Sequence, residues 1–442
     1  MKCPEAITPD LHKTLVNIDI KDDINKVHGH CQGLGCMLKN LDKSILVDVE
    51  RILDDIIVKS HHFSNADKTS HLIRPSVLFL LNQFADFDSL TTQRASDWSK
   101  KITDSVLTLG AISSSSNCDQ LYDLCAQMTP SMAKLRKIIK DEELKQQEFS
   151  HLIKTIRSND IKIPENARIC AAFLLKSFER SYFTESNIGL ITEMITEGAR
   201  SNFSLQAVAK TNIRAYFVDM RVQLLVLLVE HKILDFGTIS TCFEDYTRNN
   251  RGDIGSRLRI GAMRALQTMP LDSLSDDEFI KFFGLVLQQG AEKITNVRLE
   301  AGVTMLKFFS SKRPHLSQVE EIANKIKTHK DTGKEGTLRN KIWKQEWGGG
   351  KCFPKYANIL HLTDFQKPIL KGLLVSSGDL TQSLSSAASD CLFTYLDRIS
   401  SHDDAESKLT EFVATILSLW KNDNKNLLTK PVLKVFDEFF SK

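Results

Sequence analysis

The stretch that decides the fold reads YTRNNRGDIGSRLRIGAMRAL and covers residues 246–266. Its first half, rich in Arg, Asn and Gly, predicts a polar turn, and its second half predicts a helix. Leu258, Ala262 and Leu266 are spaced i, i+4 and i+8, so they share one face of that helix. The small side chain of Ala262 lets a neighbouring helix approach closely. The stretch therefore predicts a helix that packs tightly against a second helix.

The same spacing of apolar, Arg, small and apolar residues returns at Val297, Arg298, Ala301 and Met305. The two copies are roughly 40 residues apart, which is the length of a HEAT or armadillo helix pair. The pattern fits further segments with declining quality: 167–175, 220–228, 384–392 and 73–81. The fit is poor in the last of these, because Pro75 is expected only in a first helical turn.

Composition agrees with a helical repeat protein. The 442 residues exceed one ordinary core, and ten prolines with twenty glycines are few for an all-β chain. We therefore predict an all-α fold, a HEAT/armadillo-like α-solenoid of stacked helix pairs. Four parts are expected: diverged helical repeats over 1–157, HEAT-like repeats over 158–324, a basic Gly-rich insertion over 325–356, and C-terminal helical repeats over 357–442.

Charge and cysteine usage limit the partners and the compartment. A net charge of +3 does not indicate nucleic acid, and the longest strongly apolar stretch, 222–229, is too short to span a membrane. The N-terminus lacks the apolar core of a signal peptide. Nine scattered cysteines are typical of reduced thiols. We expect a cytoplasmic protein that binds neither nucleic acid nor membrane.

Motifs for catalysis are missing from the sequence. There is no GxxxxGK(S/T), GxGxxG, GxSxG or HExxH pattern, so no catalytic residue and no cofactor is predicted. His28, His30, Cys31 and Cys36 superficially resemble a metal cluster, but no second ligand pair has suitable spacing. The same run also fits a helix with buried thiols, and we predict no metal.

The arginines of the repeat signature have a structural interpretation. In such repeats the arginine commonly points toward a carboxylate in the adjacent turn. Arg168, Arg259 and Arg298 are expected to act in this way. Asp253, which precedes the helix, is expected to be its N-cap.

Two regions are candidates for partner contact. The first is the Arg-rich turn, with Arg248, Arg251, Asp253 and Arg257. The second is the segment 325–356, which carries nine Lys/Arg against three Asp/Glu and a Gly-Gly-Gly run. This segment suits either a flexible solvated insertion or a basic arm for an acidic partner surface. In the second reading its contacts are Lys341, Trp343, Lys344, Trp347 and Lys351.

Several blocks resemble the tubulin-folding cofactor D (tubulin-specific chaperone D) family. Asp245-Tyr246-Thr247, Arg251-Gly252-Asp253-Ile254-Gly255, Arg259 and Ala262-Met263 follow its pattern DYTxDxRGDVGxxVRxAAMxxL. Further similar blocks are Gln288–Ile294 with Arg298 and Ala301, Leu373–Ser376 with Gly378 and Leu380-Thr381, Leu392-Phe393, and Tyr395-Leu396. The departures are Asn249 and Asp379, where the pattern has Asp and Gly, and Gly261, which replaces an alanine.

The resemblance implies an α-solenoid chaperone that binds β-tubulin. It would act with the other tubulin-folding cofactors and an Arf-like small GTPase to assemble or take apart the αβ-tubulin dimer. It would stimulate GTP hydrolysis on tubulin, in the cytoplasm and with microtubules or centrosomes as places of association. Family members are much longer, so the chain resembles their C-terminal part. Two alternatives stay open: a generic HEAT/armadillo adaptor and a nonfunctional fragment.

Overall fold

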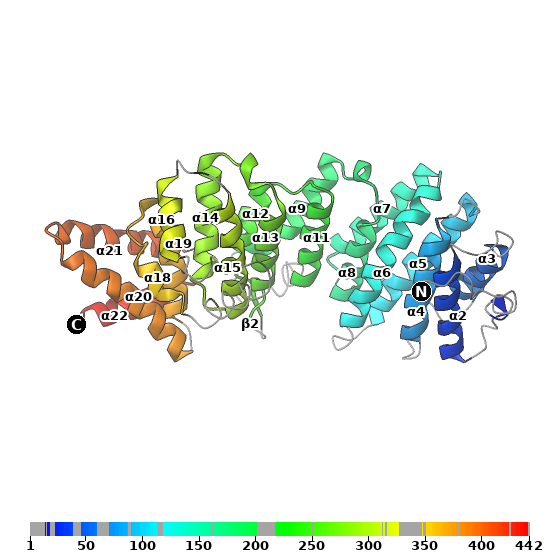
Figure 1. Ribbon diagram of the computed structural model, residues 1–442, viewed down its shortest axis with the longest axis horizontal. Helices are drawn as coiled ribbons and strands as arrows, with labels where there is room; N and C mark the ends of the chain where they lie inside the picture. Colours follow the sequence, from blue (N-terminus) through cyan, green and yellow to red (C-terminus); the bar gives the residue numbers. More distant parts are fainter. Residues whose placement is uncertain are drawn as a thin grey trace. The chain divides into compact units, whose positions relative to one another are not determined.

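A computed structural model of the chain is shown in Figure 1. It describes residues 14, 16–17, 23–38, 46–59, 70–86, 90–112, 118–160, 162–200, 217–249, 252–311, 313, 316–326, 347, 351–378, 381–423 and 426–440. Nearly all of these residues are helical, and the strand residues among them form one two-stranded pair. The prediction of an all-α fold built from stacked helix pairs is confirmed.

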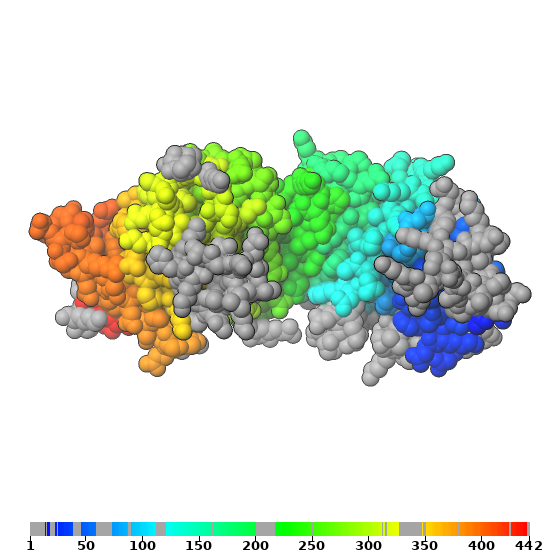
Figure 2. All heavy atoms as spheres, in the orientation of Figure 1, coloured from blue at the N-terminus to red at the C-terminus, as the bar shows by residue number. Residues whose placement is uncertain are grey.

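The chain divides into two compact units. Unit 1 comprises Met1–Met194 and Asn212–Ile233, and unit 2 comprises Ile195–Thr211 and Leu234–Lys442. Within each unit, side chains fill the spaces that the ribbon leaves between helices (Figure 2). The four sequence segments predicted above stay a prediction.

Unit 1 is a stack of helices around the largely buried helix α8. Every residue of α8 from Ala167 to Leu175 is buried, because α5, α6, α7 and α11 all pack against it. At Gly110 in α5 an added Cβ would lie 2.7 Å from the Cα of Ala167, so these two helices touch backbone to backbone. The described helices are α2 (Ile24–Met37), α3 (Leu46–Asp54), η4 (Asp55–Lys59), α4 (Ser70–Phe84), α5 (Thr92–Ile112), α6 (Cys118–Ile138), α7 (Glu142–Arg157), α8 (Glu165–Leu175), η6 (Arg180–Tyr182), α9 (Glu185–Arg200, of which residues up to Met194 belong to unit 1) and α11 (Val218–Glu230).

Unit 2 contains the stretch that decides the fold. There α12, α13, α14 and α15 lie side by side (Figure 1), and α19 packs on α14. Its described elements are α12 (Phe236–Phe243), β1 (Arg248–Asn249), β2 (Gly252–Asp253), α13 (Ser256–Thr268), η8 (Leu271–Ser273), α14 (Asp276–Gly290), α15 (Thr295–Ser310), α16 (Ser317–Ile326), α18 (Phe353–Ala357), α19 (Thr363–Ser377), α20 (Gln382–Ser400), α21 (Ala405–Lys421) and α22 (Thr429–Phe440).

The repeat signature marks the buried faces of α13 and α15. Leu258, Ala262 and Leu266 are fully buried on α13. The second copy of the signature is buried on α15 in the same way, at Val297, Ala301 and Met305. The two helices pack against each other, as the small residue in each copy predicts.

The expectation for Pro75 was wrong. Pro75 lies inside α4, which begins at Ser70, and not in its first turn. Its ring removes one backbone N–H, but the helix continues on both sides and Ser76 Oγ donates to the carbonyl of Ile73 at 2.8 Å. Packing of α4 against α2 and α6 therefore outweighs the local cost of the proline.

Among the described side chains, the cysteines are free thiols, and all except Cys36 are buried. No helix in the described ranges is both long enough and apolar enough to cross a membrane. In the same ranges no three His, Cys, Asp or Glu side chains are grouped as a metal site would require.

Candidate functional site

The polar turn before α13 is a β-hairpin. β1 pairs with β2 in antiparallel register, with Arg248 opposite Asp253 and Asn249 opposite Gly252. Gly252 has φ of 106°, a backbone conformation that residues with a Cβ rarely adopt. The two residues that join the strands, 250–251, lie outside the described residues. Gly252, the glycine of the Arg-Gly-Asp sequence, is therefore required where the chain turns back from β1 into β2.

A second glycine brings the hairpin against the end of α12. Gly255 N donates to the carbonyl of Thr247 at 3.0 Å, and Thr247 N donates to Asp245 Oδ1 at 2.9 Å. A Cβ at Gly255 would collide with both the carbonyl and the carboxylate of Asp245. Only glycine allows this approach, so Gly252 and Gly255 together fix the path of the chain into α13.

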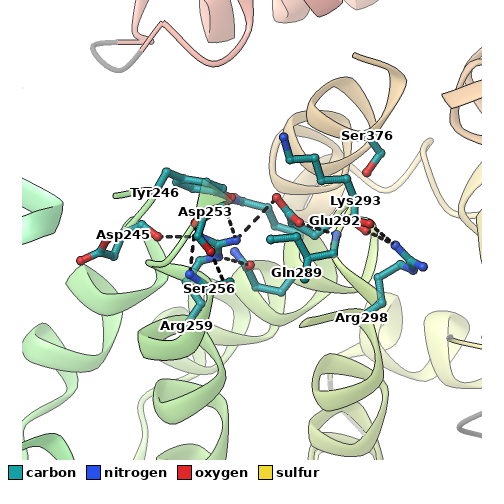
Figure 3. A network of polar contacts seen from close by, with 12 residues as sticks. Asp245, Tyr246, Asp253, Ser256, Arg259, Gln289, Glu292, Lys293, Arg298 and Ser376 are labelled. Carbon is teal, nitrogen blue, oxygen red and sulfur yellow. Dashed lines mark hydrogen bonds and ion pairs between the residues drawn. The ribbon is translucent and has the colours of Figure 1, made fainter. Parts of the chain in front are cut away.

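Arg259 of α13 holds the hairpin from below (Figure 3). Its buried guanidinium pairs with Asp253 Oδ2 at 3.0 Å and donates to the carbonyl of Asp245. Its Nε donates to Gln289 Oε1 on α14 at 3.0 Å, and its Cζ lies 4.1 Å from the centre of the Tyr246 ring. The prediction that Arg259 has a carboxylate partner is confirmed. Through its contacts Arg259 links the hairpin, α13 and α14.

Glu292 extends this network into the turn between α14 and α15. Its Oε1 lies 3.6 Å from the Arg259 guanidinium, and its Oε2 accepts from Ile294 N at 2.9 Å. Arg298 of α15 donates to the carbonyls of Glu292 at 2.8 Å and Lys293 at 2.7 Å. Arg259 and Arg298 thus both contact the turn between α14 and α15, and Arg259 also contacts the hairpin.

Burial and charge act in opposite directions on this network. Burial raises the pKa of the Glu292 carboxyl, while the nearby Arg259 charge lowers it and Asp253 raises it further. Burial alone would lower the pKa of Arg259, but attraction to Asp253 and Glu292 outweighs it, so the pKa is raised. Arg259 is therefore a permanently charged group between two carboxylates in a buried site.

Beside the network, the end of α14 packs against α18 and against Trp347. Gly290 leaves no room for a Cβ, which would collide with Tyr356 Oη and lie 2.8 Å from Trp347 Cζ3. Tyr356 Oη donates to the carbonyl of Leu287 at 3.0 Å, and Arg298 Nε donates to the carbonyl of Trp347 at 3.1 Å. The Trp347 ring therefore fills space that the glycine leaves open.

α19 crosses α14 at a third close approach. A Cβ at Gly372 would collide with the carbonyl of Gln288 and lie 2.9 Å from Ala291 Cβ. One turn further, Ser376 Oγ donates to the carbonyl of Ala291 at 2.7 Å. Gly378, after α19, faces the ring of Pro431 on α22 in the same way. Small residues thus let α19 lie directly on the end of α14.

A comparison with known protein families places part of the chain. A family model described as "Tubulin folding cofactor D C terminal" matches residues 280–442. Residues 280–442 are thus similar to the C-terminal region of tubulin folding cofactor D. The matched range, called the cofactor D region below, begins inside α14 and includes Gln289, Glu292 and Arg298. The hairpin and Arg259 precede it, yet their side chains bond to the cofactor D region.

Solved structures resemble the chain only weakly. A crystal structure of a Kap121p mutant is 13% identical with a TM-score of 0.34, and it covers 96% of this chain. A second Kap121p crystal structure is 11% identical with a TM-score of 0.34. An engineered protein is 12% identical with a TM-score of 0.32, over 97% of this chain and 99% of its own. The chain spans 45% and 46% of the two Kap121p chains.

The structure separates the predicted contact residues into three groups. Arg248 and Arg257, near the cofactor D region, and Lys351 within it are exposed. Trp347 and Asp253 are not. The predictions for Arg251, Lys341, Trp343 and Lys344 fall outside the described residues.

Two of these predictions need correction. Trp347 is 0% exposed and packs edge-on to the Tyr356 ring, so it cannot serve as a surface anchor. The Asp253 carboxylate is 5% exposed and pairs with Arg259, because a buried charge needs a partner.

The prediction that Asp253 is the N-cap of α13 also needs correction. The N-cap is Gly255, although Asp253 Oδ1 accepts from Ser256 N at 3.1 Å and so satisfies a free helical donor.

Reasoning from the residues missed the partners that the cofactor D region supplies to the hairpin. Gln289 and Glu292 occur in a block that was matched only by resemblance, and Gly290 and Gly372 give the available signal. A glycine inside a helix destabilises it by about 1 kcal/mol relative to alanine, so it usually marks a close contact.

The third arginine of the repeat signature, Arg168 of unit 1, donates to the carbonyls of Ile156 and Ser158, at 2.8 and 2.6 Å.

The Glu292→Gln variant should change how stability depends on pH. Because burial raises the pKa of Glu292 in the folded state, its contribution to stability is complete below the usual glutamate value of 4.5. That contribution is lost as the pH rises through the folded pKa. We expect the melting temperature of Glu292→Gln to fall less than that of the wild type as pH is raised from 4.5. Parallel curves for the two proteins would contradict this assignment.

Proposed function

We propose that the chain is a non-enzymatic scaffold that binds β-tubulin and helps to assemble or take apart the αβ-tubulin dimer. The observation that carries this proposal is the match of residues 280–442 to the tubulin folding cofactor D family. Support also comes from the hairpin network, because the matched range supplies two of the buried partners of Arg259, Gln289 and Glu292.

Within this proposal the other partners are the remaining tubulin-folding cofactors and an Arf-like small GTPase, in the cytoplasm. The GTP whose hydrolysis is stimulated is bound by tubulin, since this sequence holds no phosphate-binding fingerprint of its own. Arg248, Arg257 and Lys351 are the proposed tubulin contacts among the residues that the structure places on the surface.

Size-exclusion chromatography of the purified chain with αβ-tubulin tests the proposal. We expect a complex at low salt that weakens as salt is raised, because exposed charges are screened over about 10 Å at 0.1 M salt. The sample must be folded and monodisperse, which circular dichroism and light scattering establish. A folded chain that forms no complex with tubulin would contradict the proposal. Binding to other acidic proteins alone would favour the generic adaptor.

A further inference from the structure

The end of unit 2 that carries the hairpin has an unusual distribution of charge. Helices α13 and α15 begin at this end and α14 finishes there, so the hairpin lies beside the turn 292–294. Lys351 belongs to the same end, because its neighbour Cys352 directs its thiol to the carbonyl of Gly290 at 3.8 Å. We call this surface, made by the hairpin, the first turn of α13, residues 292–294 and Lys351, the hairpin edge.

Cations point outward at the hairpin edge and carboxylates point inward. Arg248, Arg257 and Lys351 are exposed. By contrast, the Asp253 and Glu292 carboxylates are 5% and 0% exposed and both pair with buried Arg259. The charge that solvent meets at this edge is therefore positive, although the residues that build it include both signs.

The opposite ends of the same helices carry the opposite charge. The connection from α13 to α14 and the first turn of α14 together expose four carboxylates, at Asp272, Asp276, Asp277 and Glu278. Arg313, the cation that pairs with Asp276, is itself only 11% exposed. The hairpin edge and the opposite ends of α13 and α14 thus expose charges of opposite sign.

We propose that the hairpin edge is a docking surface for an acidic, extended segment of a partner protein. A group of exposed cations attracts such a segment and raises its association rate without requiring a pocket. The inference rests on the proposed function for the natural partner, which would be tubulin. The chemistry of the site, several carboxylates on an unfolded chain, follows from the charges alone.

A protein segment fits this edge better than a nucleic acid. Single strands bind through aromatic side chains on which bases stack, together with basic residues. The described aromatic side chains next to the edge are withdrawn from solvent, since Tyr246 is 5% exposed and Trp347 is 0% exposed. Carboxylates need only the cations, and these are what the edge presents.

The buried network keeps the cations in place. Burying ionic groups is costly, and a buried ion pair is often no more stable than an apolar replacement. Here the Arg259 pair with Asp253 fixes β2, and β2 holds Arg248 of β1 through the strand pairing. Asp253 is therefore a positioning residue for the exposed Arg248.

The test is fluorescence anisotropy of a labelled oligo-glutamate peptide with the full chain at low salt. The variant Arg248→Glu/Arg257→Glu/Lys351→Glu reverses the edge. The matched control Lys281→Glu/Lys367→Glu/Lys421→Glu makes the same change in net charge at exposed lysines elsewhere in unit 2. Melting curves establish that both variants fold. Single-stranded RNA and tubulin are measured in parallel.

The proposal expects the edge variant to bind the peptide about tenfold more weakly than the control. The binding free energies of three exposed ion pairs typically add up to a change of this size. Equal weakening by both variants, or tighter binding of RNA than of the peptide, would overturn it. If the wild type binds the peptide through this edge but not tubulin, the proposed function fails and the docking surface stands. If it binds tubulin and both variants bind tubulin equally, the docking surface fails and the function stands.

Discussion

Replacing Arg259 by methionine is expected to lower the free energy of unfolding by about 3–5 kcal/mol. The side chain is 0% exposed, and its loss leaves the Asp253 and Glu292 carboxylates buried without their counter-ion. Gln289 Oε1 also loses the donor that bonds it at 3.0 Å. Methionine keeps much of the volume, so the effect reports the charge and the hydrogen bonds. Thermal and urea unfolding followed by circular dichroism measure it.

Arg264→Met is the matched control for this variant. Arg264 lies on the same helix, and its side chain is 68% exposed while it pairs with Glu300 at 3.0 Å. An exposed pair of this kind contributes about 0–1 kcal/mol. Similar melting temperatures for the two variants would show that Arg259 is not the centre of the network. Adding Glu292→Gln to Arg259→Met should restore part of the stability, because one unpaired buried charge is removed.

The second large effect is expected from Gly372→Ala. The added methyl group would collide with the backbone carbonyl of Gln288, which a rotation of a side chain cannot relieve. Overpacking of this kind lowers stability by about 1–3 kcal/mol. We expect this loss even though alanine favours the helical state of α19 by about 1 kcal/mol over glycine. The melting temperature and the denaturation midpoint of the full chain measure the change.

Gly189→Ala is its control. A Cβ at Gly189, in α9, would meet nothing within 4 Å, so only the gain in helix propensity remains. This variant should be as stable as the wild type or more stable, by up to about 1 kcal/mol. If Gly372→Ala behaves in the same way, α19 does not cross α14 as closely as the structure shows.

The parts of the fold that were predicted depend on local periodicity. The faces of α13 and α15 follow from residues three and four positions apart, and both are buried as expected. A carboxylate partner for Arg259 was also predicted, but not that it is Asp253, six residues before it, which was expected to be the N-cap of α13. These features need no knowledge of which distant segments meet.

The features that were missed depend on contacts between distant segments. Gln289 is 30 residues from Arg259, and nothing in local spacing couples them. Trp347 lies in a basic, Gly-rich segment whose composition indicates exposure, but its ring occupies the space beside Gly290. That side chain is buried because it fills the space between α14, α15 and α18. Composition does not report the shape of such a space.

The affinity of the wild-type chain for αβ-tubulin, measured at low and at raised salt, tests the central claim most directly. The account predicts a saturable complex whose Kd rises with salt and rises again when Arg248, Arg257 and Lys351 are reversed to glutamate. A folded chain with no measurable affinity for tubulin at low salt would contradict it.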